Sequence, residues 1–582
     1  MCGIAGVLGG AESVGPIIEA LRHRGPDGVR VEQVRGGSVG HARLSIIDLE
    51  CGWQPLHAAG STVIGNGEIY NYLELIEEFG LQCATGSDFE PLLHLYAREG
   101  EKAFGRLRGM YAFCLIGGDG RTWLVRDPFG IKPLYVRRDH AGVVFASEPQ
   151  ALAPAAAPST QGATEVLTLG YLAASGATVW PGVERVPPGA IWNVAPAETH
   201  SAPSHLTPLP TVVASAKSDE AELLNRLDAV LENSVAVHQR SDVPYGLFLS
   251  GGIDSTTIAT LMSRLNARPV TAFTCGFESE GARDERRVAE RVARTLDLDW
   301  RETTFGEEDF WRVLPEVAAA LDDPTTDYAT LPTYHLAAAA KGTLTVVLSG
   351  EGGDELFAGY GRYRRALRPT LLGGRPAEPQ VDAPFLKTCS PAAAAARSPE
   401  RDVIEAWRRA ALENGGTGGG SVLERAQRAD IATWLPNDLL LKLDRSLMAH
   451  GLEGRTPLLD REVAAFAFSL PEKFKVRGRY GKWILRRWLE RHCPAAEPWA
   501  RKQGFTVPVA SWIAPRSADL AAALSRHRGL AQVCDMEVVQ AVFSDGALAK
   551  HRWPLLFYAV WWNIHVDGME QGEALSAVLG TV

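Results

Sequence analysis

The stretch YGLFLSGGIDSTTIATLMSRL, residues 245–265, decides the fold of the second half of this chain. An apolar strand leads into a tight glycine loop, and the loop leads into a helical pattern that we expect to start near Thr256. The same order recurs in TLTVVLSGEGGDELFAGYGRY at 343–363, and the apolar run VTAFTCGF at 270–277 lies between the two. Apolar strands that alternate with helices are typical of a parallel sheet covered on both faces. We therefore predict an α/β parallel-sheet domain with a helical, Leu/Ala/Arg-rich C-terminal part.

The first 190 residues have a different pattern. Short β-type runs such as STVIG, RTWLV and GVVFA are separated by Gly and Pro turns, and the clearest helix is NYLELIEEF at 71–79. This pattern predicts an α+β domain.

Prolines divide the two halves. The segment VAPAETHSAPSHLTPLP carries four prolines, which interrupt both helices and strands. We predict a first domain over 1–195, a linker over 196–217 and a second domain over 218–582, with Ser218 able to cap the next helix.

Composition excludes several classes of protein. The 582 residues are 46% hydrophobic and 22% charged, as in ordinary globular proteins. A net charge of -10, from 59 basic and 69 acidic residues, makes nucleic acid a poor candidate partner. We see no apolar run of about 18 residues and no secretory signal, so we expect neither a membrane partner nor export. Eight cysteines without a CxxC pair predict a reduced, cytoplasmic protein.

The two glycine loops predict a phosphate site. Glycines let backbone N–H groups converge on an anion, and the N-terminus of the following helix adds its dipole. Asp254 and Asp354 each follow a predicted parallel strand, at the edge where open α/β sheets bind ligands. Such a pair suits Mg²⁺ with pyrophosphate, whereas two helix-capping aspartates are the structural alternative. Neither loop reads GxxxxGK[ST], so a Walker-type mechanism is not indicated.

Cys2 is the most informative residue of the first half. Removal of Met1 would leave a thiol beside a free α-amine, which can act as its general base. On its own, a small residue without a role is the commoner explanation. The motifs that follow change this interpretation: RHRGPDG (22–28), HARLSIID (41–48), NGEIYN (66–71), GSDFE (86–90) and RDPFGIKPLY (126–135).

This ordered set resembles the glutamine amidotransferase domain of the N-terminal-nucleophile family, in the branch fused to asparagine synthetase. The resemblance implies a four-layer α/β/β/α sandwich. It also implies that Cys2 attacks the side-chain amide of glutamine, which releases ammonia and forms a glutamyl thioester. The implied glutamine-binding residues are Arg43 for the α-carboxylate, Glu68 and Asp88 for the α-ammonium group, and the Asn66 side chain with the Gly67 N–H for the oxyanion hole.

The second half resembles the synthetase domain of the same family, so that the resemblance covers about 500 residues. DVPYGLFLSGGIDS, VLSGEGGDELFAGY, LLLKLDRSLMAHGLEGRTPLLD, RYGKWILRRWL and RKQGFTVPVASW follow in order. SGGxDS is similar to the pyrophosphate loop of ATP pyrophosphatases, which cleave between the α- and β-phosphates and form an acyl-adenylate.

The resemblance implies an ATP site as well. Its residues are Leu249 and Cys275 for adenine, Ser250, Gly251, Gly252, Asp254 and Ser255 for pyrophosphate, Ser349 and Gly350 for ribose and phosphate, Asp254 and Asp354 for Mg²⁺, Glu351 for adenylate formation, and Lys482 for charge on the phosphates. Arg455 and Lys442 are further candidates for the charged site.

Together the two halves imply transfer of ammonia from glutamine to a carboxylate that ATP has activated. The resemblance also implies an apolar passage for the ammonia between the two sites. Members of the family are often homodimers, so a second copy of this chain is an expected partner. Aspartate is the favoured acceptor. A different carboxylic acid stays open, because this chain reads RTPLLD at 455–460 where relatives usually read RVPFLD, and because DDPTTDYATLPTYH at 322–335 is less typical. A non-catalytic binding or regulatory protein is the third hypothesis, which the intact motifs argue against.

Overall fold

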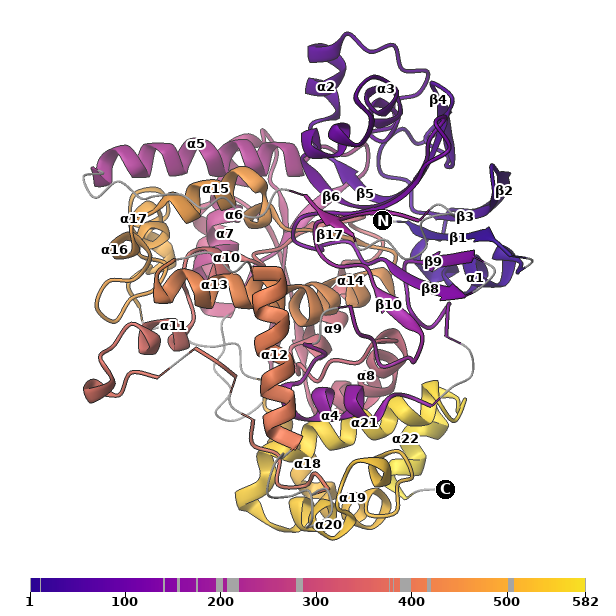
Figure 1. Cartoon of the computed structure of the whole chain (residues 1–582). Helices are drawn as coiled ribbons and strands as arrows, with labels where there is room; N and C mark the ends of the chain where they lie inside the picture. The colour runs from indigo at the N-terminus through magenta and orange to yellow at the C-terminus, as the bar shows by residue number, and fades with distance from the viewer. Residues whose placement is uncertain are drawn as a thin grey trace.

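The computed structural model of the chain (Figure 1) describes most of its residues. The described ranges are 2–10, 12–139, 142–153, 157–173, 176–194, 203–206, 219–278, 286–375, 377–379, 381–387, 399–415, 420–500 and 507–580. RKQGFT, the first half of the last predicted motif, lies outside them, and so does Ser218.

Two six-stranded antiparallel sheets form the N-terminal part. The first contains, in spatial order, β10 (Val183–Arg185), β8 (Tyr135–Asp139), β9 (Gly142–Ala146), β1 (Gly3–Gly9), β3 (Gly37–Arg43) and β2 (Gly28–Val34). The second contains β12 (Ser204–His205), β11 (Ala190–Asn193), β7 (Thr122–Arg126), β6 (Gly109–Ile116), β5 (Ser61–Ile69) and β4 (Leu56–Ala58).

Side chains along β1 alternate between two cores, as the period of a strand requires. Ile4 and Leu8 pack between the two sheets, whereas Ala5 and Val7 pack against a helix on the outer face. The flanking helices are α1 (Val14–Ala20) on the first sheet, and α2 (Tyr72–Phe79) and α3 (Glu90–Glu99) on the second (Figure 1). The four layers confirm the predicted α/β/β/α sandwich, and α2 confirms the helix expected at 71–79.

The C-terminal part is built on a five-stranded sheet in which every neighbouring pair is parallel, as predicted. Its order is β15 (Asp299–Phe305), β14 (Thr271–Phe277), β13 (Tyr245–Phe248), β16 (Val346–Leu348) and β17 (Glu453–Arg455). The chain runs outward from β13 to β15 and then returns to the other side of β13. Ligands of open α/β sheets bind where the strand order reverses in this way, here between β13 and β16.

The helix after the first glycine loop, α6 (Ile253–Leu265), begins three residues before the expected start near Thr256. Gly252 occupies the N-cap, and its carbonyl accepts a hydrogen bond from the Thr256 N–H at 3.0 Å. Asp254 and Ser255 therefore lie in the first turn of the helix. The predicted start of the helix was wrong because Gly252, the last glycine of the loop, is itself the N-cap. No connecting residues therefore lie between the loop and the helix.

The predicted linker over 196–217 is described only at 203–206. There β12 pairs with β11 and extends the second sheet. The following helix, α5 (Glu220–His238), is capped by Asp219, whose carboxylate accepts the Ala221 N–H. The domain boundaries stay a prediction.

The remaining helices are α4 (Thr160–Leu169), α7 (Arg286–Thr295), α8 (Glu307–Ala320), α9 (Thr330–Ala340), α10 (Gly353–Leu356), α11 (Gly361–Ala366), α12 (Pro399–Gly415), α13 (Val422–Ala432), α14 (Leu440–Met448), α15 (Arg461–Ser469), α16 (Glu472–Lys475), α17 (Trp483–His492), α18 (Val509–Ile513), α19 (Ser517–Leu524), α20 (Met536–Ser544), α21 (Arg552–His565) and α22 (Gln571–Leu579). None of the described helices is both long and apolar enough to cross a bilayer.

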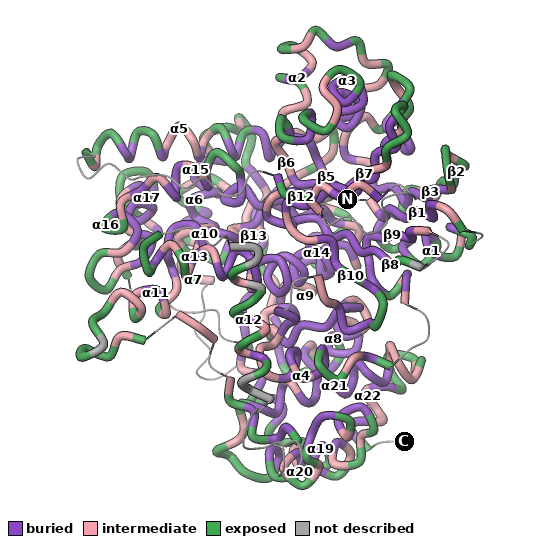
Figure 2. Tube along the Cα trace, viewed as in Figure 1, coloured by how far each residue is buried: buried purple, intermediate pink, exposed green. Residues whose placement is uncertain are grey.

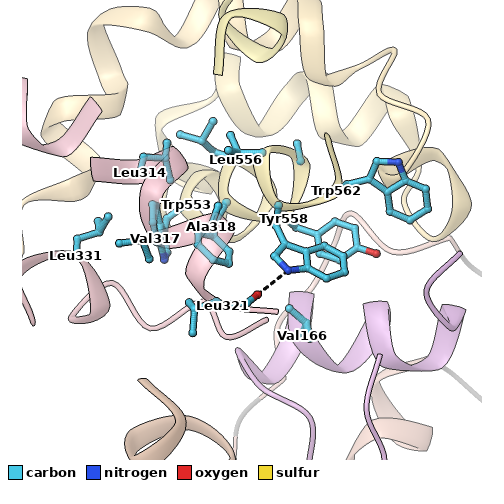
Figure 3. Close-up of a cluster of buried hydrophobic side chains, with 14 of the residues drawn as sticks. Val166, Leu314, Val317, Ala318, Leu321, Leu331, Trp553, Leu556, Tyr558 and Trp562 are labelled. Atoms are coloured by element: carbon cyan, nitrogen blue, oxygen red, sulfur yellow. Dashed lines mark hydrogen bonds between the residues drawn. The ribbon is translucent and has the colours of Figure 1, made fainter. Parts of the chain in front are cut away.

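Helix α21 is buried along most of its length (Figure 2). It lies against α8 and against α4 of the N-terminal part, where Val166 and Leu314 join the same apolar cluster as Leu556 (Figure 3). The indole of Trp561 also donates a hydrogen bond to the Leu321 carbonyl at 2.7 Å (Figure 3). The helical C-terminal part therefore ties both halves of the chain together.

Buried charges cross the contact between the halves. Arg24 of the N-terminal half donates to Glu148 at 2.7 Å and to Asp444 of the C-terminal half at 2.8 Å. Arg445 donates to Asp444 at 2.7 Å and to Asp322 at 2.9 Å. All five side chains are at most 8% exposed. Each charge in this network depends on a partner, because an unpaired charge in such a place is costly.

Replacing Arg445 should therefore destabilise the protein. An Arg445→Leu substitution leaves Asp322 buried without its cation, at a cost of about 3–5 kcal/mol. Thermal unfolding followed by circular dichroism should show a melting temperature lower by roughly 2–4 °C, given the unfolding entropy of a chain of this length. Arg264→Leu is the matched control, since Arg264 forms a half-exposed pair with Asp228 and should cost less than about 1 kcal/mol. If the melting temperature falls equally in the two variants, the buried network does not contribute more to stability than a half-exposed ion pair.

Candidate active sites

Cys2 lies at the start of β1, beside β5. Its backbone N–H donates to Asn66 Oδ1 at 3.1 Å, and its Sγ lies 3.8 Å from the Leu44 carbonyl oxygen. Burial raises the pKa of the Cys2 thiol above its usual value. A neutral thiol needs a base before it can attack, so the chemistry of Cys2 depends on a proton acceptor close by.

Asn66 and Gly67, two neighbouring residues of β5, can offer hydrogen-bond donors beside Cys2. Asn66 is fully buried, and its Nδ2 has no hydrogen-bond partner among the described residues. Gly67 has φ +133°, and a Cβ atom there would lie 2.0 Å from the Met110 carbonyl oxygen. Only glycine fits at position 67, which keeps the backbone open beside Asn66. This pair can bind an oxyanion at a place set by the strand.

Two buried carboxylates follow in the same site. Asp88 Oδ2 accepts the Ile69 N–H at 2.7 Å, and burial raises the pKa of Asp88 to about 7. Burial and the neighbouring Asp88 raise the pKa of Glu68 well above its usual range. Glu68 Oε2 pairs with Arg455 at 3.2 Å, while Oε1 has no partner in the part of the chain that the structure describes. Such a pair suits a cationic ligand, whose charge would relieve the repulsion.

Arg43 is the last of the glutamine-binding residues expected here. Its guanidinium stacks on Trp53, 5.0 Å from the ring centroid, and donates to the carbonyls of Asp48 at 2.6 Å and Leu49 at 3.2 Å. These contacts hold the group rigidly, and burial lowers its pKa. The positive charge of Arg43 works against the effect of burial and lowers the pKa of the Cys2 thiol.

The second site lies at the carboxyl ends of β13 and β16. In the first loop, Ser250 Oγ and Ser255 Oγ are 3.0 Å apart, and Ser250 Oγ accepts the Gly252 N–H at 3.2 Å. Gly251 has φ +73°, which permits the tight turn. The loop is thus folded onto the N-terminus of α6, where an anion is favoured.

Lys482 brings the two predicted metal ligands together. Its Nζ bonds to Asp254 and lies 2.8 Å from Asp354 Oδ1, and the side chain is 4% exposed. Burial opposes the charge of Lys482, but the two aspartates outweigh it and raise its pKa to about 12. Sequence reasoning placed Asp254, Asp354 and Lys482 in one site, and the three side chains meet.

The two loops touch where they carry glycine. A Cβ atom at Gly350 would lie 2.8 Å from Asp254 Cβ, and one at Gly353 would lie 2.4 Å from Asp254 Oδ1. Ser349 at the start of the second loop is buried, and its N–H donates to the Arg455 carbonyl at 2.8 Å. Glycine is needed at 350 and 353 because the loops approach so closely.

The residues expected near adenine lie at the same edge of the sheet. The Leu249 N–H donates to the Phe273 carbonyl at 2.9 Å, and the Leu249 carbonyl accepts the Thr274 hydroxyl at 2.7 Å. Cys275 is buried near the end of β14. These backbone groups are fixed before any ligand binds.

A charged cluster that sequence reasoning largely missed adjoins Glu351. Lys442 Nζ lies 4.0 Å from Glu351 Oε1 and 2.9 Å from Asp327 Oδ2. Asp438 accepts the Thr325 hydroxyl, and its Oδ2 is buried with no partner in the described ranges. Lys442 was a candidate, but Asp327 and Asp438 were not. Asp327 lies in the segment 322–335 that was noted as atypical, and Asp438 precedes Lys442 by four residues, so both positions could have been considered.

Two other expectations were revised. The Arg455 side chain faces Glu68 in the first site rather than the phosphate loops. Of the two atypical residues of RTPLLD, Thr456 and Leu458, the second packs beneath the second loop, where a Cβ at Gly353 would lie 2.8 Å from Leu458. By contrast, Asp327 of the atypical segment 322–335 does reach the surroundings of Glu351 through Lys442.

Comparison with known proteins finds a family model for each half of the chain. The asparagine synthase family model matches residues 226–564, more than half of the chain, and the glutamine amidotransferase domain model matches residues 1–204. The chain belongs to the asparagine synthase family. It is an ATP-dependent ligase that carries a glutamine amidotransferase domain, as the resemblance implied.

Relatives match over nearly the full length. Asparagine synthetase [glutamine-hydrolyzing] 1 of Bacillus subtilis is 30% identical, over 99% of this chain and 99% of that protein. A putative asparagine synthetase [glutamine-hydrolyzing] of Mycobacterium bovis is 33% identical, over 97% and 98%. Among solved structures, a glutamine phosphoribosylpyrophosphate amidotransferase from B. subtilis has 15% identity and a TM-score of 0.27, covering 52% of this chain and 81% of that chain.

A methyl group at position 353 should disable the second site. Gly353→Ala forces Asp254 out of place, and a shift of about 1 Å can cost roughly 100-fold in rate. Pyrophosphate release from ATP should fall accordingly, while hydrolysis of glutamine continues. Gly361→Ala is the control, since its Cβ would meet nothing closer than 3.6 Å. Unchanged pyrophosphate release in Gly353→Ala would contradict the contact between the loops.

Proposed function

We propose that the protein is a glutamine-dependent asparagine synthetase of the cytoplasm. It would hydrolyse glutamine at Cys2, pass ammonia to the second site, and there convert aspartate and ATP to asparagine, AMP and pyrophosphate. The convergence of Asp254 and Asp354 on Lys482, in the same chain as the Cys2–Asn66 contact, is the observation that carries this proposal. The full-length relatives support it.

In the glutaminase step, the α-amine that removal of Met1 exposes would accept the thiol proton of Cys2. The thiolate would then attack the glutamine amide, and Asn66 Nδ2 with the Gly67 N–H would stabilise the oxyanion. Glu68 and Asp88 would hold the α-ammonium group. We assign the α-carboxylate to Arg43, whose planar group suits it.

In the synthetase step, the aspartates fit Mg²⁺ because Lys482 draws both to one point and carboxylate oxygens are the ligands that this ion prefers. When bound, Mg²⁺ would neutralise the negative charge of the pyrophosphate group. Loop residues 250–255 and the N-terminus of α6 would bind pyrophosphate through backbone N–H groups. Lys482 would then neutralise the negative charge that develops on the phosphates. Glu351 would take part in forming the adenylate, next to the acceptor.

The identity of the acceptor depends on the cluster next to Glu351. Lys442 can neutralise an acceptor carboxylate, and two carboxylates, Asp327 and Asp438, lie close to it. A cationic ammonium group would suit those carboxylates, which favours an amino acid such as aspartate. A synthetase that amidates another carboxylic acid is the second candidate, because segment 322–335 departs from the usual family pattern.

Pyrophosphate release with ATP, Mg²⁺ and glutamine, with and without aspartate, tests the proposal. Strong stimulation by aspartate, with asparagine identified as product, is the expected result. Glutaminase activity without aspartate-dependent pyrophosphate would refute asparagine synthesis, and a screen of other acids would follow.

A substitution at Cys2 should abolish the glutaminase half-reaction and leave the synthetase half-reaction intact. Cys2→Ala removes the nucleophile, so glutamine-dependent synthesis should fall to background while ammonia-dependent synthesis continues. Protein that mass spectrometry shows to retain Met1 should behave in the same way, because its α-amine is blocked. Cys51→Ala is the control at an exposed cysteine. Loss of the ammonia reaction in folded Cys2→Ala protein would contradict the division of roles.

Glutamine should bind more weakly in acid. The pKa of Asp88 is raised to about 7, so below that pH the group is neutral and attracts the α-ammonium less. Calorimetry on the Cys2→Ala variant should show a Kd that rises with falling pH below 7, by up to about tenfold per pH unit. Asp88→Asn should bind weakly at every pH. If the Kd of the Cys2→Ala variant for glutamine does not change with pH, the assignment of Asp88 to the glutamine-binding site is wrong.

A further inference from the structure

A group of potential metal ligands lies in the outer helical layer of the N-terminal part. Glu90 and His94 are one turn apart on α3, and Cys83 belongs to the loop that precedes this helix. The Cys83 thiol, a Glu90 carboxylate oxygen and a His94 ring nitrogen all lie within 4.8 Å of one another. Thiolate, carboxylate and imidazole are the three kinds of ligand that Zn²⁺ takes in proteins. None of the three residues was assigned to either active site.

The loop holds the Glu90 carboxylate in one orientation. Oε1 accepts the Ala84 N–H at 2.6 Å, while Oε2 accepts the Thr85 N–H at 2.7 Å and also the Thr85 hydroxyl. A carboxylate has about four lone-pair positions, so one position remains, and it is on Oε1. Cys83 is held beside the start of α3 because its neighbour Ala84 is fixed in this way. Hydrogen bonds that orient a ligand from outside are typical of metal sites.

His94 has a nitrogen that the fold leaves unused. Its Nε2 is buried and has no hydrogen-bond partner among the described residues. Nε2 lies 3.5 Å from Glu90 Oε1, the oxygen with the remaining lone pair, without the geometry of a hydrogen bond. A buried polar atom of this kind costs free energy until it finds a partner.

The spacing of these atoms fits a tetrahedral zinc ion. Two ligand atoms that each lie about 2.0–2.2 Å from the ion are about 3.3–3.6 Å apart. The separation of 3.5 Å between His94 Nε2 and Glu90 Oε1 is within that range. The Cys83 sulfur, within 4.8 Å of both ligand atoms, has to approach by at most about 1 Å.

We propose that Cys83, Glu90 and His94 bind a zinc ion, with water as the fourth ligand. The ion joins the loop after α2 to α3 and so stabilises the folded chain, because an unfolded chain does not hold the three ligands together. It also fastens both ends of the turn that carries Asp88. This proposal does not depend on the proposed function, and its tests need neither glutamine nor ATP.

The site can be tested by metal analysis of the Cys2→Ala protein, in which the thiol of the first active site cannot contribute. Chelator-treated protein, dialysed against Zn²⁺ with excess Mg²⁺ to occupy the aspartates of the second site, should retain about one equivalent of zinc. Co²⁺ in place of Zn²⁺ should give a thiolate-to-cobalt charge-transfer band, which reports a cysteine ligand. Protein that retains no zinc, or that binds cobalt without this band, would overturn the proposal.

Matched variants in the same Cys2→Ala background identify the ligands. Cys83→Ala and His94→Gln should each weaken zinc binding by about tenfold or more, and Cys83→Ala should abolish the charge-transfer band. Cys51→Ala and His57→Gln are the controls, at an exposed cysteine and at a histidine paired with Glu32 on the surface. Both controls should bind zinc like the parent. Parent affinity and an intact band in Cys83→Ala would refute the assignment.

Thermal unfolding provides a second readout. Zinc at about 100 times its Kd should raise the melting temperature of the Cys2→Ala protein by several degrees, since the ion binds the folded chain. The same zinc concentration should leave the melting temperature of the variant that also carries His94→Gln almost unchanged. An equal rise in the two proteins would place the zinc elsewhere and overturn the proposal.

Discussion

Charges buried between the two halves are the constraint on which the rest of the structure depends. Arg24 and Glu148 come from the first half, Asp322, Asp444 and Arg445 from the second, and none can lose its partners cheaply. A network of this kind tolerates one relative orientation. The distance between the two active sites is consequently a property of the fold rather than of a flexible connection.

The same principle operates inside the second site. Asp254 and Asp354 would repel each other at the carboxyl edge of the sheet, and Lys482 between them removes that repulsion. The lysine therefore keeps the site assembled before substrates arrive. It also leaves a cation in place where the phosphates of ATP would bring new negative charge.

Three indoles hold the segment that leads toward the charged cluster near Glu351. Trp561 donates to Leu321, Trp180 donates to the Asp322 carbonyl at 2.8 Å, and Trp553 donates to the Thr326 carbonyl at 2.6 Å. Trp180 belongs to the N-terminal half, while the other two lie on α21. This segment is thus held by both halves and by the C-terminal helices together.

The sequence by itself determined the local elements and the residues whose chemistry is tied to a motif. Period-two patterns, apolar strands and glycine loops predicted both sheet types. The loops SGGIDS and SGEGGD pointed to Asp254 and Asp354, and the family resemblance of the N-terminal motifs pointed to Cys2. These features depend on neighbours in sequence, so they can be found there. A helix start was missed by three residues because a cap depends on backbone geometry.

Tertiary structure alone decided the contacts between distant segments. Arg455 and Glu68 are 387 positions apart, and nothing in either motif indicates that they pair. Asp327 likewise meets Lys442, 115 positions further along the chain, only because α14 and the segment before α9 pack together. Their positions follow from the requirement that each buried charge find a partner in three dimensions, which no spacing along one chain expresses.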